Sequence, residues 1–302
     1  MPVQQQLFFV QRFKGKVLFG VPMRDCTSLR VGGPADVMAF PQDESDLKDL
    51  MNFASSRRFP LYILGSGTNL LVRDGGVRGI VVNMTEGFNE INWRDEVSAV
   101  AGAGVKLAAL VSECAQRGLK GLEFASGIPG TVGGAAVMNA GAYGHEMKEV
   151  IEGVEIMTRK GKRGFIPGSE IDFSYRSAGF TEGSVVTRVH LSFEKGTAEE
   201  VRESVAEFAR RRKSTSSINL PSAGSIFKNP EGKVAGKLIE EAGLKGIARG
   251  GAAVSEVHAN YIVNRGGARA ADVLSLMALI RDRVYKGTGI VLEPEIKVIG
   301  ED

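Results

Sequence analysis

The 302 residues include 39 glycines, and their clustering constrains the fold more than any other feature. They concentrate in three segments, at residues 65–79, 127–144 and 246–267. Glycine adopts positive φ angles without steric cost and lets the backbone approach a ligand closely. We therefore expect each segment to be a tight connection or a ligand-binding loop.

The first glycine segment lies between two strand-like apolar runs, Leu61–Leu64 and residues 79–84. A dinucleotide-binding G-x-G-x-x-G loop needs a third glycine and a helix directly after it. Here Leu70 stands in place of that glycine, and the turn signal at residues 74–76 leaves no room for a crossover helix. A P-loop is also excluded, because no Lys-Ser or Lys-Thr pair follows the glycines.

Two interpretations of Gly65-Ser66-Gly67 remain. A tight turn between strands is the simpler one, since a lone glycine pair carries little specific information. The other is a nest of backbone N–H groups that binds an anion without a helix. The side-chain donors of Ser66, Thr68 and Asn69 favour the nest.

The second glycine-rich segment, residues 126–144, contains six glycines and four alanines. A segment with so few packing atoms is typical of a loop that wraps a flat or phosphorylated ligand. Two such loops, each after a strand, suggest one extended cofactor.

Hydrophobic periodicity predicts an α+β protein with three regions, residues 1–85, 86–196 and 197–302. The first combines strand-like runs with one amphipathic helix that starts near Asp43. The second has one helix, with Gly118 as its expected C-terminal cap, followed by strands of a mostly antiparallel sheet. The third begins with a helix whose capping box starts at Thr197.

Composition limits the possible partners. Lys and Arg total 38 against 35 Asp and Glu, so the chain is nearly balanced and we expect neither a nucleic-acid nor a membrane partner. Two cysteines, Cys26 and Cys114, are too few for a disulfide framework and fit a reducing cytoplasm. The apolar run at residues 7–10 is too short for a signal segment or a membrane span. A cytoplasmic location is expected.

Seven motifs resemble, in order, those of the UDP-N-acetylenolpyruvoylglucosamine reductase (MurB) family of peptidoglycan precursor synthesis. They are LGSGTNLLV, GIPGTVGGAAVMNAGAYG, FSYRSAGF, PSAGSIFKNP, AGKLIEEAGLKG, HANYIVN and LEPEIKVIG. The resemblance runs from about Thr27 to Gly300, nearly the whole chain. The short stretch after FSYRSAGF is similar to the shorter form of the family, which lacks an inserted substrate-covering segment.

This resemblance implies a fold and an activity. The fold is the two-subdomain FAD-binding type of vanillyl-alcohol oxidase (the PCMH type), with a C-terminal α+β substrate-binding domain. FAD would be held non-covalently. The activity would be NADPH-dependent reduction of UDP-N-acetylglucosamine enolpyruvate to UDP-N-acetylmuramate. The expected partners are therefore NADPH and UDP-N-acetylglucosamine enolpyruvate. We expect a monomer.

The resemblance also implies the site residues. Arg176, Ser225 and Glu295 match the catalytic positions. The expected FAD-binding residues are Leu64, Gly65, Ser66, Gly67, Thr68, Asn69, Gly127, Ile128, Gly133, Gly134, Asn139 and Gly141. The expected substrate-binding residues are Tyr143, Tyr175, Arg210, Lys213, Lys228 and Asn229. For Arg210 and Lys213, in a basic run expected to end a helix, the register is open by one residue.

The chemistry asks for three roles. Hydride addition to an enolpyruvyl ether builds negative charge on the carboxylate and then requires a proton at the ether-bearing carbon. Arg176 would pair with the carboxylate, Ser225 would donate the proton, with Lys228 as a possible aid, and Glu295 would organise them. Glu293 is the alternative acid. The two glutamates alternate along an expected strand and should face opposite sides, and the family pattern favours Glu295.

Two other hypotheses stay open. The chain could be an FAD-dependent oxidoreductase of the same flavin fold on another substrate, or an inactive relative that binds UDP-sugars. The presence of all three catalytic matches argues against the inactive relative. His145, His190 and His258 are scattered along the chain, so no metal site is expected.

Overall fold

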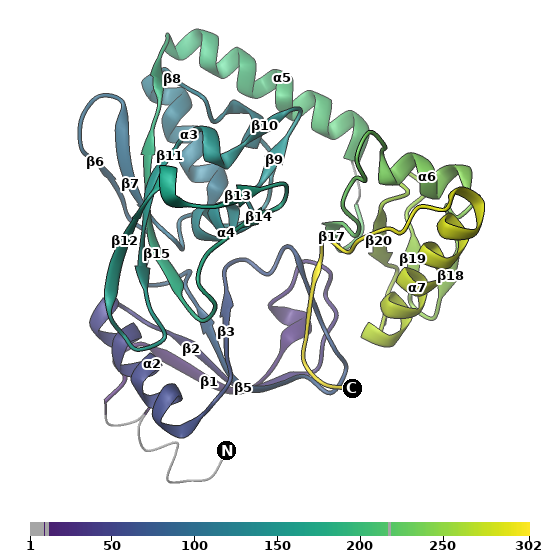
Figure 1. Cartoon of the computed structure of the whole chain (residues 1–302), viewed down its shortest axis with the longest axis horizontal. Coiled ribbons are helices and arrows are strands. Elements are labelled where there is room, and N and C mark those ends of the chain that lie inside the picture. Colours follow the sequence, from purple (N-terminus) through teal and green to yellow (C-terminus); the bar gives the residue numbers. More distant parts are fainter. Residues whose placement is uncertain (1–8, 10–11, 217–218) are drawn as a thin grey trace. The chain divides into compact units, whose positions relative to one another are not determined.

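The computed structural model describes residue 9, residues 12–216 and residues 219–302 (Figure 1). The chain divides into two compact units. The first unit is Met1–Phe19, Val37–Ser66 and Gly79–Arg211; the second is Gly20–Asp36, Gly67–Arg78 and Arg212–Asp302. Of the apolar run at residues 7–10, only Phe9 lies among the described residues. The division of the sequence into three regions stays a prediction.

Four strands near the N-terminus form a sheet of order β1-β2-β5-β3. Their bounds are Lys16–Pro22, Pro34–Phe40, Val77–Asn83 and Leu61–Leu64 for β1, β2, β5 and β3. Helix α2 (Glu44–Arg57) packs Leu47 and Leu50 into one apolar core with Val82 of β5. Asp43 caps this helix by accepting a hydrogen bond from the Asp46 N–H at 2.8 Å, which confirms the predicted start.

A five-stranded antiparallel sheet of order β12-β11-β15-β7-β6 dominates the rest of the first unit. The strands are Arg163–Pro167, Ile151–Met157, Val185–Ser192, Ser98–Gly102 and Ile91–Trp93, in that order. Helices α3 (Leu107–Arg117) and α4 (Val132–Val137) contribute to the same core as β11 and β15. The predicted cap of α3 is confirmed, because Gly118 adopts φ +70° there.

Helix α5 (Ala198–Ser216) has the predicted capping box. The Glu200 N–H donates to Thr197 Oγ1, and the Thr197 N–H donates to Glu200 Oε2, both at 3.2 Å. The helix does not end in the basic run at residues 210–213, as the sequence predicted, but continues through Ser216. A basic run at this place is compatible with helix continuation, because Arg and Lys are good helix formers.

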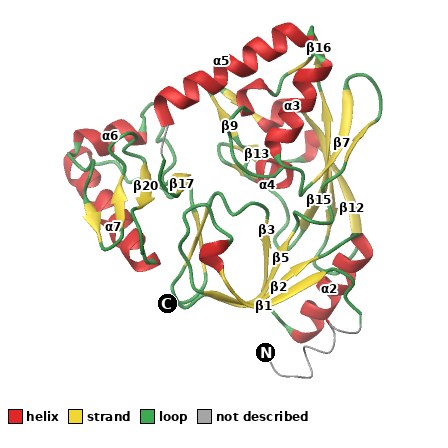
Figure 2. Ribbon diagram, turned by 180° about the vertical axis from the view of Figure 1, so that it is seen from behind, coloured by secondary structure: helices red, strands yellow, loops and turns green. Residues whose placement is uncertain are grey.

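The second unit contains a four-stranded antiparallel sheet of order β17-β20-β19-β18. The strands are Ser222–Ser225, Tyr261–Asn264, Ala252–Val254 and Ala248–Arg249. Helices α6 (Ala235–Glu241) and α7 (Ala270–Thr288) pack on it, as Figure 2 shows. Strand β4 (Leu70–Val72) pairs in parallel with β21 (Lys297–Ile299), which brings the first glycine segment and the C-terminal segment side by side.

The remaining elements are short. The strands are β8 (Leu119–Lys120), β9 (Gly141–Ala142), β10 (His145–Glu146), β13 (Phe173–Ser174), β14 (Ser177–Ala178) and β16 (Glu194–Lys195). Short 3-10 helices occupy Met23–Asp25, Glu123–Ala125, Met147–Glu149 and Gly168–Glu170. None of the helices in the described part of the chain has both the length and the apolar character needed to cross a bilayer.

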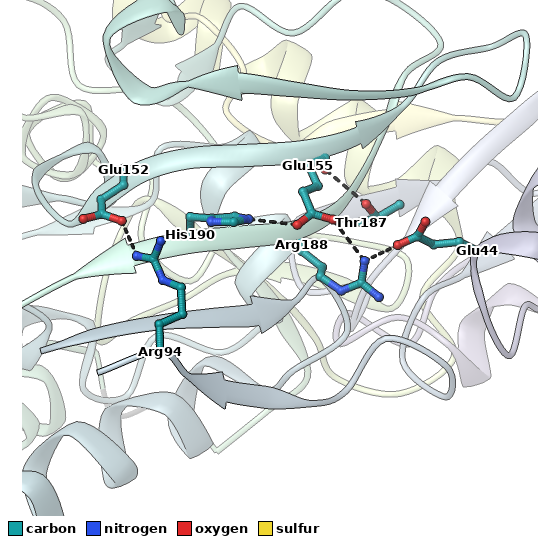
Figure 3. Close-up of polar contacts among 7 residues, drawn as sticks. All are labelled: Glu44, Arg94, Glu152, Glu155, Thr187, Arg188 and His190. Atoms are coloured by element: carbon teal, nitrogen blue, oxygen red, sulfur yellow. Dashed lines mark hydrogen bonds and ion pairs between the residues drawn. The ribbon is translucent and has the colours of Figure 1, made fainter. Parts of the chain in front are cut away.

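A row of charged side chains joins α2 to the five-stranded sheet within the first unit (Figure 3). Glu44 at the start of α2 is buried and pairs with Arg188 of β15. Arg188 also contacts Glu155 of β11 at 3.0 Å, and Glu155 contacts His190 Nε2 at 2.9 Å. Burial alone would raise the pKa of the Glu155 carboxyl, but hydrogen bonds from His190 and Arg188 outweigh it and lower that pKa.

Candidate active site

The first glycine loop connects two strands, β3 and β4, without an intervening helix, as predicted. Gly67 adopts φ +64°, and a Cβ there would lie 2.2 Å from the Cys26 carbonyl oxygen. A Cβ on Gly65 would lie 2.5 Å from Thr131 Oγ1. Gly67 is thus required by its positive φ and by the close Cys26 backbone, whereas at Gly65 the Thr131 side chain fills the space that a Cβ would take. Leu64–Ser66 belong to the first unit and Gly67–Asn69 to the second.

The second glycine-rich segment contains the short helix α4, which Thr131 caps through a hydrogen bond from the Gly134 N–H. Gly127 precedes it at φ +76°. The Gly133 N–H donates to the Ala103 carbonyl at 3.0 Å. By contrast, within the described residues the backbone N–H groups of Gly65, Ser66 and Gly127 donate to no other group of the protein. Such N–H groups are available to an anion.

Arg176 occupies a strained turn. It lies between the paired strands β13 and β14, at φ +59°, a conformation that a non-glycine residue rarely adopts. Its Nη2 donates to the Gly141 carbonyl at 2.8 Å, and its guanidinium lies 4.8 Å from the Tyr175 ring centroid. These contacts bring three residues predicted for the site together.

Asn139 connects this turn to its surroundings. Its side-chain amide donates to Glu146 Oε2 at 2.9 Å and to the Ser174 carbonyl at 3.1 Å, while Oδ1 accepts from the Lys148 N–H. Both amide donors are therefore used within the protein. Asn139 was predicted to bind the cofactor, and its contacts favour a role in holding the turn.

Tyr143 also has a positive φ, +57°, and it packs on α5. Its ring centroid lies 5.4 Å from that of Phe208. The Arg211 guanidinium lies 4.8 Å from the Tyr143 ring centroid. The arginine next to Tyr143 is thus Arg211, which directly follows the predicted Arg210; both arginines are exposed.

In the second unit, Ser225 ends β17 and pairs with Tyr261 of β20. The next residues hold the C-terminal segment by backbone hydrogen bonds. The Glu295 N–H donates to the Ile226 carbonyl at 2.8 Å, and the Lys228 N–H donates to the Glu293 carbonyl at 2.9 Å. The predicted residues Ser225, Lys228 and Glu295 therefore lie on directly bonded segments.

The glutamate pair does not lie on a strand, contrary to the sequence prediction. Strand β21 begins only at Lys297, and Pro294 makes an isolated bridge with Phe227. Pro294 accounts for this, because proline has no N–H and cannot join a regular ladder. Glu293 is exposed, with Lys228 Nζ 3.6 Å from its Oε2, whereas Glu295 is half-buried.

Asn69 links the glycine loop to this segment. Its side-chain amide donates to the Glu295 carbonyl at 3.2 Å, and its backbone carbonyl accepts from the Lys297 N–H at 3.1 Å. Asn229, predicted to contact substrate, accepts a hydrogen bond from the Ala235 N–H at the start of α6. Both amides therefore have positioning contacts within the second unit.

Asn260 was missed by the sequence reasoning, although it lies in the quoted motif HANYIVN. It is 3% exposed, accepts from the Phe227 N–H at 3.0 Å and donates to the Phe227 carbonyl at 2.8 Å. Its own N–H donates to His258 Nδ1. Burial lowers the pKa of His258, which favours the neutral ring that can accept this hydrogen bond. Asn260 thus fixes the segment between Ser225 and Lys228.

Metal ligands are not grouped here. Among residues 9, 12–216 and 219–302, no three His, Cys, Asp or Glu side chains lie in an arrangement that could hold a metal ion.

Comparison with known proteins adds to this geometry. Residues 35–163 match the FAD binding domain family, and residues 216–299 match the C-terminal domain of UDP-N-acetylenolpyruvoylglucosamine reductase. Together with the two glycine segments, these matches define an FAD-containing oxidoreductase with a separate C-terminal domain. Among the described residues, the backbone N–H groups of Gly65, Ser66 and Gly127 donate to no other group of the protein, and Ser66 adds a hydroxyl. These donors, with Gly127 at a positive φ, fit the pyrophosphate of FAD.

Whole-chain relatives are more specific. UDP-N-acetylenolpyruvoylglucosamine reductase from Alkaliphilus oremlandii is 43% identical over 95% of this chain and 94% of its own. The enzyme of that name from Caldanaerobacter subterraneus is 45% identical over 95% of each chain. The crystal structure of the Thermus caldophilus reductase (MurB) has a TM-score of 0.81 at 38% identity and covers 94% of this chain and 98% of its own. The chain belongs to the UDP-N-acetylenolpyruvoylglucosamine reductase family.

Proposed function

We propose that this protein reduces UDP-N-acetylglucosamine enolpyruvate to UDP-N-acetylmuramate with NADPH, using non-covalently bound FAD. The observation that carries the proposal is the whole-length similarity to enzymes of this name. Arg176, Ser225 and Glu295 are all present at the matching motifs. The same similarity does not favour another substrate or an inactive relative. The protein would act as a cytoplasmic monomer in cell-wall precursor synthesis.

Bound FAD supplies hydride transfer between NADPH and the substrate. The substrate carboxylate gains negative charge as the double bond is reduced, and Arg176 pairs with it. The contact of Arg176 with the Gly141 carbonyl and its position over Tyr175 support this role, because both restrict the guanidinium to one region.

Ser225 donates a proton from Oγ to the ether-bearing carbon. A hydroxyl is a weak acid, so this step requires a strongly basic carbon, which the charge built up during reduction provides. The Glu295 backbone is fixed by hydrogen bonds to Ile226 and Asn69, which supports a role for Glu295, a half-buried residue held next to the segment that contains Ser225.

The sugar nucleotide is bound by Lys213, Lys228, Tyr143 and an arginine of α5. The stack of Arg211 on Tyr143 favours Arg211 over Arg210 as the helix arginine next to the substrate.

Ser225→Ala tests the proposal in the two half-reactions. We expect FAD to stay bound and NADPH to reduce it at the wild-type rate. Reoxidation by the enolpyruvyl sugar nucleotide should slow by about a hundredfold or more, the usual range for loss of a general acid. Ser222→Ala on the same strand is the matched control and should reoxidise normally. Equal reoxidation by both variants would exclude Ser225 as the proton donor.

A further inference from the structure

Lys106 lies directly before α3 in the first unit and is exposed. Its Nζ donates a hydrogen bond to Ser66 Oγ at 2.9 Å. Sequence reasoning assigned it no role. The structure thus places a lysine ammonium at a loop whose own donors, backbone N–H groups and hydroxyls, are all uncharged.

The backbone around Lys106 also contacts the second glycine segment. Lys106 makes an isolated β-bridge with Thr131, the Leu107 N–H donates to the Gly130 carbonyl at 3.1 Å, and the Val132 N–H donates to the Val105 carbonyl at 2.8 Å. Thr131 in turn contacts the first loop, because its Oγ1 would lie 2.5 Å from a Cβ on Gly65. Lys106 therefore stands where the two glycine-rich segments of this unit meet.

The chemistry of the Lys106–Ser66 contact favours a phosphate ligand. An ammonium has three N–H donors and no acceptor, so the bond to Ser66 uses one and leaves two for another acceptor. Because Ser66 Oγ accepts from Lys106, its own hydrogen is free to donate elsewhere. The pair thus offers an anion a positive charge and an oriented hydroxyl together.

We propose that Lys106 binds the pyrophosphate of FAD and orients the Ser66 hydroxyl toward it. The pyrophosphate carries two negative charges, and a lysine beside backbone N–H donors is a common way to bind phosphate. The inference rests on FAD binding and is independent of the sugar-nucleotide substrate in the proposed function.

Binding of FAD to the full-length apoprotein tests this proposal. The variants are Lys106→Met, Lys106→Arg and, as a matched control, Lys162→Met, which removes an exposed lysine of the same unit. The Kd for FAD is measured from the quenching of flavin fluorescence at low and at high salt. The thermal midpoint of each apoprotein confirms that it folds, and Lys106→Gln replaces the Met variant if that one does not.

Loss of one charge-assisted hydrogen bond should raise the Kd of Lys106→Met about tenfold. Its Kd should also depend less on salt than that of the wild type, while Lys106→Arg and Lys162→Met stay near the wild-type Kd. The proposal is overturned if Lys106→Met keeps the wild-type Kd and salt dependence, or if Lys162→Met weakens FAD equally. If the wild-type protein binds FAD and turns over, and Lys106→Met has the same Kd for FAD, this inference alone is rejected. A wild type that binds no FAD would reject the proposed function as well.

Discussion

Replacement of Asn260 by alanine should destabilise the second unit and disturb the Ser225 segment. The Asn260 amide makes two hydrogen bonds to the backbone of Phe227, which is itself only 1% exposed. Alanine leaves a buried N–H and a buried C=O without these partners. Each unpaired group costs roughly 1–3 kcal/mol, so the expected loss in the free energy of unfolding for the two groups is roughly 2–6 kcal/mol.

The assay combines urea unfolding, followed by circular dichroism, with stopped-flow measurement of both half-reactions. Reoxidation by the enolpyruvyl substrate should slow, because Phe227 lies between Ser225 and Lys228 and its neighbour Ile226 holds Glu295. Asn89→Ala removes an exposed amide of the first unit and is the control. A loss below about 1 kcal/mol, together with normal reoxidation, would refute the argument.

Three further predictions follow from other contacts. Gly67→Ala should lower the free energy of unfolding and weaken FAD binding, since residue 67 has φ +64° and its new Cβ would lie 2.2 Å from the Cys26 carbonyl oxygen. Unchanged thermal unfolding and FAD affinity would contradict this prediction. Arg176→Lys should keep FAD bound but slow reoxidation by the enolpyruvyl substrate, because lysine lacks the planar fork; a wild-type rate would exclude the assigned role. The lowered pKa of Glu155 means that its ionised form, bonded to His190 and Arg188, contributes stability at neutral pH that is lost as pH falls through that pKa. Glu155→Gln should therefore flatten the acid side of the stability profile measured by urea unfolding, and an unaltered profile would count against this network.

Local sequence patterns predicted much of the fold because the forces behind them act over a few residues. Asp43 caps α2, Gly118 ends α3 and Thr197 opens α5, each through contacts with neighbours in the chain. The absence of a helix after Gly67 was predictable for the same reason, since the turn residues at 74–76 follow so closely.

Contacts between distant segments escaped prediction. No periodicity indicates that Asn69 bonds to the backbone of Glu295, or that Lys106 reaches Ser66. The irregular path at Glu293–Glu295 was also missed, because alternation of side chains predicts a strand only where a partner can supply ladder hydrogen bonds. Even the motif that contains Asn260 gave no sign of which backbone groups its amide would hold.

The most direct test of the central claim is an anaerobic absorbance titration of the purified full-length protein. The account predicts a flavin spectrum that NADPH bleaches and that one equivalent of UDP-N-acetylglucosamine enolpyruvate restores, with UDP-N-acetylmuramate as the product. A protein that shows no flavin absorbance even after FAD is added, or whose reduced flavin is not reoxidised by this substrate, would contradict the account.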